Sequence, residues 1–103
     1  QFKYPPYFRI IGIELKDKNF SVVENAAKWF GKALENKFGS NVLGPELPPV
    51  GRVRNKFIFG ILLKIPKTQS LEATKKYILN VERNFNALKN FSSVRINIDI
   101  DSY

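Results

Sequence analysis

The chain has 103 residues, which is enough for one domain but not for two, and its hydrophobic content of 44% predicts a packed core rather than disorder. It contains no cysteine and no histidine. This excludes disulfides, zinc–thiolate sites and thiol nucleophiles, and it removes the side chain best suited to proton transfer near neutral pH. A formal charge of +8, from 17 basic and 9 acidic residues, is typical of domains that attract nucleic acid, acidic peptides or anionic lipid, although it also serves plain solubility.

The first predicted element is a strand over residues 7–16. Its apolar positions Ile11, Ile13 and Leu15 alternate with Gly12 and Glu14, as in a strand with one buried face. The polar run over residues 17–19 ends it. The residues before it are expected to form a linker, over residues 1–6, from a preceding part of a longer protein, because the chain has no initiating methionine and carries Pro5 and Pro6 just ahead of the strand.

A helix is predicted over residues 21–38. Ser21 and Glu24 fit a capping box, in which each side chain satisfies a backbone N–H that the first turn leaves unpaired. The apolar residues recur at helical spacing and form one face. Trp29 lies at the edge of that face, where packing against the core is the default expectation and contact with a partner is the alternative.

A short extended piece over residues 41–43 leads into a long loop. Residues 44–55 carry Pro45, Pro48 and Pro49, so no regular structure is expected there. The clearest strand follows over residues 56–65. The aromatic residues of this strand, and the order of strands and helices along the chain, resemble an RNA-recognition motif, which stacks bases on exposed aromatic side chains. Phe57 and Phe59, however, share the phase of the apolar residues that face the core, which argues against base stacking.

Ser70 is expected to cap a second helix that runs to about residue 89, and a final alternating strand covers residues 94–101. The order is strand, helix, strand, strand, helix, strand. It predicts an α+β fold of the βαββαβ, split βαβ-like type, a two-layer sandwich with two helices on one face of a four-stranded sheet. Residues 1–103 then make a single domain.

Basic residues around the long loop form the first candidate site. The predicted DNA-binding residues are Arg52, Arg54, Lys56, Lys64 and Lys67. Cations that share a surface displace counterions from a phosphate backbone and bind it without reading sequence. The alternative is an ordinary solvated loop whose charges protect a sheet edge from aggregation.

A second candidate surface lies on the sheet face opposite the helices. Ile58, Gly60 and Leu62 occupy the outward phase of the strand over residues 56–65, and exposed apolar residues there suggest docking of another domain. The alternative is that another part of the chain covers them. Acidic residues on the same face, Glu14 and Asp99 among them, are expected to be solvated, so no metal site is predicted.

Four motifs stand in order along the chain: Tyr4-Pro5-Pro6-Tyr7, Val42-Leu43-Gly44-Pro45, the basic and aromatic strand over residues 52–64, and the closing Ile96-Asn97-Ile98-Asp99-Ile100-Asp101. With these motifs the chain resembles the C-terminal domain of the PriA family, the primosomal protein N′ helicases of replication restart. The motifs span nearly the whole chain, and their order and spacing are more specific than any one of them alone.

The resemblance implies a non-catalytic accessory domain of an ATP-dependent 3′–5′ DNA helicase in the bacterial cytoplasm, at the nucleoid. The implied partners are branched or single-stranded DNA, the helicase core of the same chain and the acidic tail of single-stranded DNA-binding protein, with no membrane. ATP, magnesium and zinc are expected in the parent protein and no cofactor in this domain. Ile58 stands where many members have arginine and Gly60 where many have glutamine, which weakens the implied role in tail binding.

Overall fold

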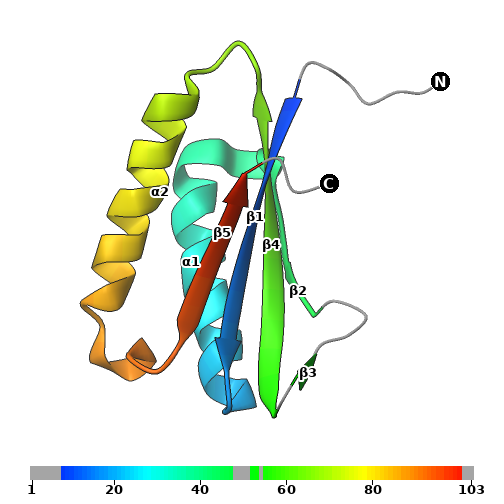
Figure 1. Cartoon of the computed structure of the whole chain (residues 1–103). Coiled ribbons are helices and arrows are strands. Elements are labelled where there is room, and N and C mark those ends of the chain that lie inside the picture. Colours follow the sequence, from blue (N-terminus) through cyan, green and yellow to red (C-terminus); the bar gives the residue numbers. More distant parts are fainter. Residues whose placement is uncertain (1–7, 48–51, 54, 101–103) are drawn as a thin grey trace, which may run out of the picture.

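The computed structural model describes residues 8–47, 52–53 and 55–100, with the backbone alone at residues 52 and 53. The predicted α+β architecture is confirmed: two helices pack on one face of an antiparallel sheet (Figure 1). The elements are β1 (Phe8–Asp17), α1 (Phe20–Phe38), β2 (Val42–Glu46), β3 (Arg52–Val53), β4 (Lys56–Pro66), α2 (Leu71–Asn86) and β5 (Arg95–Ile100), with short 3₁₀ turns at Gly39–Asn41 and Lys89–Phe91.

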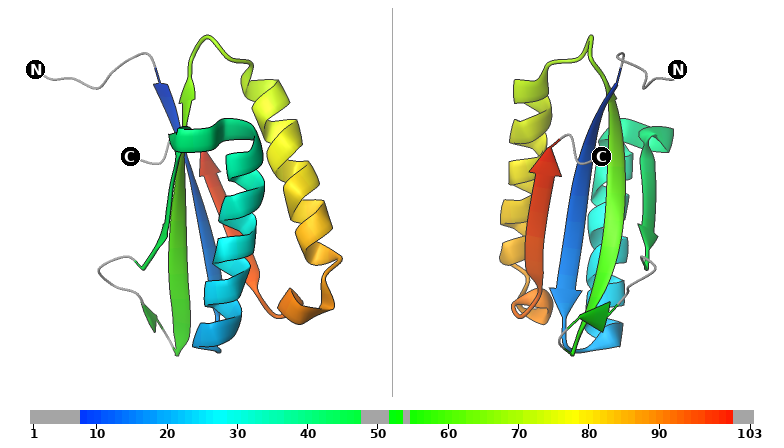
Figure 2. Two further views of the ribbon diagram at one scale, coloured as in Figure 1. Left: turned by 180° about the vertical axis from the view of Figure 1, so that it is seen from behind. Right: turned by 45° about the vertical axis from the view of Figure 1, so that its right-hand side comes forward.

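The sheet has the strand order β2-β4-β1-β5, and the two-residue β3 pairs with the start of β4. The long strands β1 and β4 lie at its centre, where all of β1 pairs with residues 57–66 of β4. The left view of Figure 2 shows both helices in front of the sheet, and the right view shows the sheet in front of them. One face of the sheet is therefore covered by helices, and the other is open.

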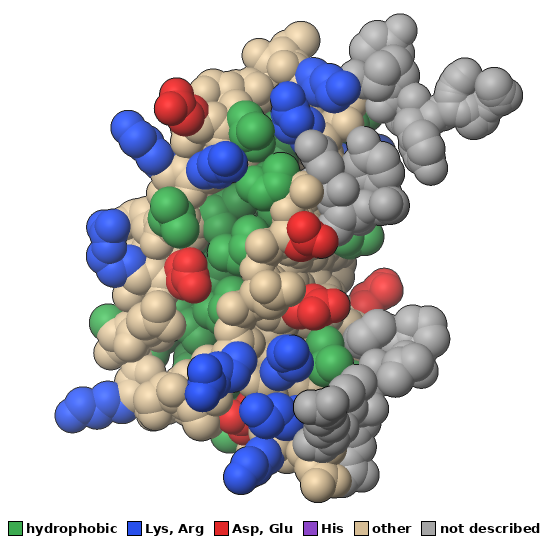
Figure 3. Space-filling view, viewed as in Figure 1, with side chains coloured by type: hydrophobic (Ala, Val, Ile, Leu, Met, Phe, Trp, Pro, Cys, Tyr) green, Lys and Arg blue, Asp and Glu red, His purple; other side chains and the backbone are tan. Residues whose placement is uncertain are grey.

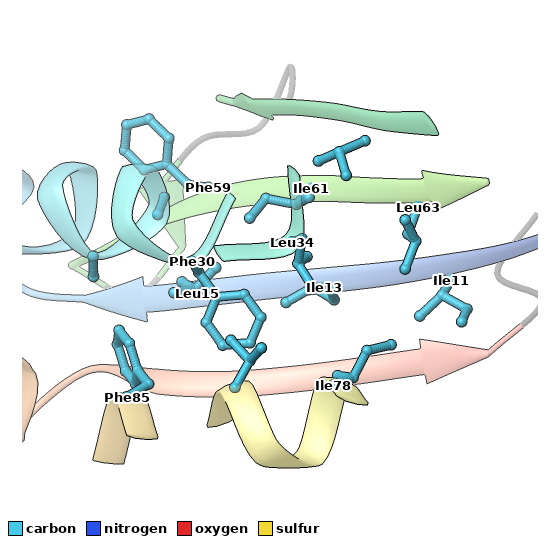
Figure 4. Packing of buried hydrophobic residues seen from close by; sticks show 14 of the residues in the cluster. Ile11, Ile13, Leu15, Phe30, Leu34, Phe59, Ile61, Leu63, Ile78 and Phe85 are labelled. Carbon is cyan, nitrogen blue, oxygen red and sulfur yellow. The ribbon is translucent and has the colours of Figure 1, made fainter. Parts of the chain in front are cut away.

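The core lies between the helices and the sheet. Alternate residues point into it, from Ile11 to Leu15 of β1 and from Phe59 to Ile65 of β4, which confirms the predicted phase of both strands and places Phe59 inside (Figure 4). Phe30 of α1 and Phe85 of α2 meet edge to face with ring centroids 5.7 Å apart. Trp29 packs against Phe85 with ring centroids 5.6 Å apart, as expected for a residue at the core boundary.

The start of α1 differs from the prediction. The helix begins at Phe20, and the Asn19 side chain caps it by accepting a hydrogen bond from the backbone N–H of Val22 at 3.1 Å. The buried Asp17 carboxylate in turn accepts from the backbone N–H of Asn19 at 2.9 Å. The capping box at Ser21 is therefore wrong, because the turn held by Asp17 places the cap two residues earlier, at Asn19.

Replacing Asn19 by alanine is expected to lower the free energy of unfolding by about 1 kcal/mol, the usual cost of removing a helix cap. Ser21→Ala is the matched control, since Ser21 lies inside the helix and is exposed. Urea unfolding followed by circular dichroism checks both variants. A larger loss for Ser21→Ala than for Asn19→Ala would contradict the observed cap.

The proline-rich segment also differs from the prediction of a wholly irregular loop. β2 continues through Pro45 to Glu46, with a shift of register against β4 between Leu43 and Glu46. β2 is an edge strand and Pro45 lies within this irregularity, two settings in which a sheet tolerates proline. Farther along, Ser70 caps α2 as predicted, but this helix ends at Asn86 rather than near residue 89.

Over the part of the chain that is described, neither helix is long and apolar enough to cross a membrane.

Candidate nucleic-acid interface

The open face of the sheet carries the outward residues of its central strands. Strand pairing fixes which of them are neighbours. Lys16 of β1 lies opposite Ile58 of β4 on one side and opposite Arg95 of β5 on the other. Lys16 and Arg95 are thus adjacent on one face although they are far apart in sequence.

Four basic residues meet at one end of this face. β1 ends there, and β4 and β5 begin there. We call this cluster the basic end; it consists of Lys16, Lys18, Lys56 and Arg95. Three of these residues line a shallow hollow together with Asp17, Ser92 and Ser93. Figure 3 shows lysine and arginine side chains gathered at the lower end of this view, below a group of acidic side chains.

The acidic residue in this hollow, Asp17, accepts hydrogen bonds from neighbouring groups of the same chain. Asp17 is 7% exposed and accepts a hydrogen bond from the Ser93 hydroxyl at 2.6 Å, in addition to the one from the backbone of Asn19. Within the described part of the chain, none of the four cations of the basic end forms an ion pair with a carboxylate. Their positive charge is therefore not neutralised by a described carboxylate and is available to an anionic ligand.

The predicted DNA-binding residues do not all gather in one place. Lys56 belongs to the basic end. Lys64 lies eight residues farther along β4, about 26 Å away at the rise of an extended strand, and its ammonium group sits 4.7 Å from the centroid of the Phe8 ring. Lys67 follows β4 at the same far end.

The two predicted arginines fall in or beside the undescribed segment. The backbone of Arg52 pairs with that of Phe57, which brings β3 to the same end of the sheet as Lys56. Arg54 lies outside the described residues. The prediction missed Lys16, Lys18 and Arg95. The alternation of the first and last predicted strands offered a signal for two of them, since it placed Lys16 and Arg95 on the outward phase.

The predicted docking residues do share the open face. Ile58 is partly buried and Leu62 is 43% exposed, while Gly60 lies between them. A shallow depression at mid-sheet includes Gly60 and Leu62 in its lining, and Glu14, Glu46 and Asp99 bring carboxylates to it. The open face is therefore divided into a positive end and a negative middle.

The comparisons with known proteins give the family. The model of the primosomal protein N C-terminal domain family matches residues 1–103. No curated protein is a significant match. Among solved structures, "De novo designed protein Foldit4" is similar in fold, with a TM-score of 0.65 and 8% identity over 93% of this chain and 98% of that one.

That likeness concerns the fold alone, since a designed protein of such low identity carries no function across. The family match covers the entire sequence, including every motif that suggested the resemblance. This chain therefore belongs to the primosomal protein N C-terminal domain family, a family of small accessory domains tied to the primosome.

Proposed function

We propose that this domain binds the phosphate backbone of branched or single-stranded DNA through its basic end, as an accessory domain in replication restart. One observation carries the proposal: Lys16, Lys56 and Arg95, from three neighbouring strands, converge with Lys18 on one surface and have no carboxylate partner among the described residues. Membership of a primosome-related family supports it.

The chemistry of these residues favours binding without sequence readout. Lysine ammonium groups act as point charges toward phosphate, and arginine adds a planar pair of donors. Binding releases the counterions condensed on the DNA, so its free energy comes chiefly from the salt-dependent electrostatic term. Phe59 is buried and Phe57 packs against the core, so neither presents a ring for base stacking on the open face.

Under this proposal the domain acts beside an ATP-dependent 3′–5′ helicase core in the same parent protein. ATP hydrolysis, magnesium and zinc belong to that core. This chain contributes an anchoring surface that holds one arm of a fork or a single strand near the motor.

Nuclear magnetic resonance mapping of the contact surface tests the proposal. Single-stranded and forked DNA titrated into the ¹⁵N-labelled chain are expected to shift the backbone amides of Lys16, Lys18, Lys56 and Arg95 most. Shifts that cluster on α1 and α2, or around the acidic middle of the sheet, would refute this placement. The same titration with duplex lacking a fork shows whether branching matters.

A second role, as a protein-docking module for the helicase core, is favoured by the exposed leucines at mid-sheet. Leu43 is 54% exposed and lies opposite Leu62, which is 43% exposed. Apolar contacts of this kind are typical of surfaces that another domain covers. An acidic tail, such as that of single-stranded DNA-binding protein, meets repulsion from Glu14 and Asp99 there and would bind more favourably at the basic end.

A further inference from the structure

The depression on the open face owes its shape to two glycines. Gly12 of β1 pairs with Leu62, and Gly60 of β4 pairs with Glu14, so the two glycines lie diagonally across adjacent strands. Both occupy the outward phase, where other residues would raise a side chain. The resulting mid-sheet depression has a volume of about 480 Å³. A methyl group added at Gly60 would find its nearest neighbour, the Glu46 carbonyl oxygen, 4.0 Å away.

An apolar ledge borders the mid-sheet depression on the β2 side. Leu43 and Leu62 are cross-strand neighbours, and both rank among the most exposed large hydrophobic residues that are described. Side chains directly opposite each other in an antiparallel pair contact one another. The ledge therefore offers a continuous apolar strip beside the glycine floor.

Carboxylates line the remainder of the mid-sheet depression. Glu14, Glu46 and Asp99 are exposed and stand with Asn97 around it, so three of the nine acidic residues of a chain with a charge of +8 lie at one spot. None of the three forms an ion pair with a basic side chain in the described part of the chain. The described residues include no group of acidic side chains that is suited to hold a metal ion.

This combination selects a ligand with both apolar and cationic parts. A phosphate backbone is repelled by the carboxylates, and a purely aliphatic segment gains no electrostatic attraction from them. A lysine or arginine has an aliphatic stem that lies on a flat apolar floor while its charged head reaches nearby oxygens.

We propose that the mid-sheet depression receives a lysine or arginine side chain of a partner protein segment, with an aliphatic neighbour of that residue packed on the Leu43 and Leu62 ledge. The inference rests on the docking role proposed above and specifies the kind of partner side chain that the docking surface binds. It also separates the two halves of the open face: the basic end binds nucleic acid, and the acidic middle binds a basic protein segment.

Peptides of matched shape test this assignment. Acetyl-Leu-Arg-Leu-amide is titrated into the ¹⁵N-labelled chain beside the same peptide with glutamine or glutamate in the central position. The arginine peptide is expected to shift the amides of Gly12, Leu43 and Gly60, and to bind about fivefold more tightly than the glutamine peptide. The glutamate peptide is expected to avoid these amides.

A double variant, Glu14→Gln with Asp99→Asn, provides the second arm. Both side chains are exposed, so the fold is expected to persist, and a urea unfolding curve checks this. The variant is expected to bind the arginine peptide no better than the glutamine peptide, while its affinity for single-stranded DNA is unchanged or higher.

Three results would overturn the proposal. Equal binding of the arginine and glutamine peptides would leave an apolar docking surface without charge selection. No binding of any peptide would remove the docking role altogether, whereas DNA binding at the basic end would stand. Shifts of the same amides that depend on protein concentration, without peptide, would identify a second copy of the chain as the occupant.

Discussion

Replacing Lys16, Lys56 and Arg95 together by glutamine is expected to weaken the binding of single-stranded DNA by about 100-fold at about 0.1 M salt. Each lost phosphate contact removes roughly 0.7 of a released counterion, and at this salt concentration each is worth about a factor of five in the binding constant. The three side chains occupy the outward phase of their strands, on the open face, and none is buried, so the fold is expected to survive. Fluorescence anisotropy with a labelled oligonucleotide measures the change.

The matched control removes the same charge from the opposite side of the domain. Lys32 of α1 and Lys75 and Lys76 of α2 are exposed on the helices, and their replacement by glutamine lowers the net charge by the same amount. A loss of less than about threefold is expected, because long-range attraction is largely screened at this ionic strength. Equal losses in the two triple variants would show that net charge, rather than the basic end, governs binding.

Gly44→Ala is expected to lower the free energy of unfolding by about 3 kcal/mol. Gly44 has φ of 102°, a region that residues with a Cβ rarely adopt. An added Cβ would also lie 2.8 Å from the backbone carbonyl oxygen of Gly60, so β2 would have to move away from β4. Chemical denaturation reports the change as a lower midpoint in urea.

Gly60→Ala is the control on the neighbouring strand. Its Cβ would point into the open depression, with no atom nearer than 4.0 Å, so its stability is expected to change by less than about 1 kcal/mol. A Gly44→Ala variant as stable as Gly60→Ala would mean that β2 does not hold the close approach to β4. The ledge that Leu43 forms beside the depression would then lose its structural basis.

The layers of the fold could be predicted from local sequence. The alternation of Ile11, Ile13 and Leu15 and the inward phase of Phe59 follow from the two-residue repeat of a strand, which needs no knowledge of partners. The cap at Ser70 likewise depends on neighbours within one turn. The cap at Asn19 was missed because it depends on Asp17, whose other partner, Ser93, lies at the distant end of the chain.

The grouping of charges could not be predicted in the same way. Lys56 and Lys64 are close in sequence, yet an extended strand holds them at opposite ends of the sheet. Lys16 and Arg95 are distant in sequence, yet antiparallel pairing of β1 and β5 sets them opposite each other. Strand register is a tertiary property, so a basic surface built across strands becomes visible only when that register is known.

The salt dependence of DNA binding tests the location of the phosphate contacts most directly. The slope of the logarithm of the binding constant for single-stranded DNA against the logarithm of the salt concentration counts the phosphates that the domain neutralises. Replacing Lys16, Lys56 and Arg95 by glutamine is expected to make that slope shallower by about 2, at roughly 0.7 for each contact. A variant that keeps the slope of the unmodified chain would contradict the assignment of DNA to the basic end, even if its affinity were lower.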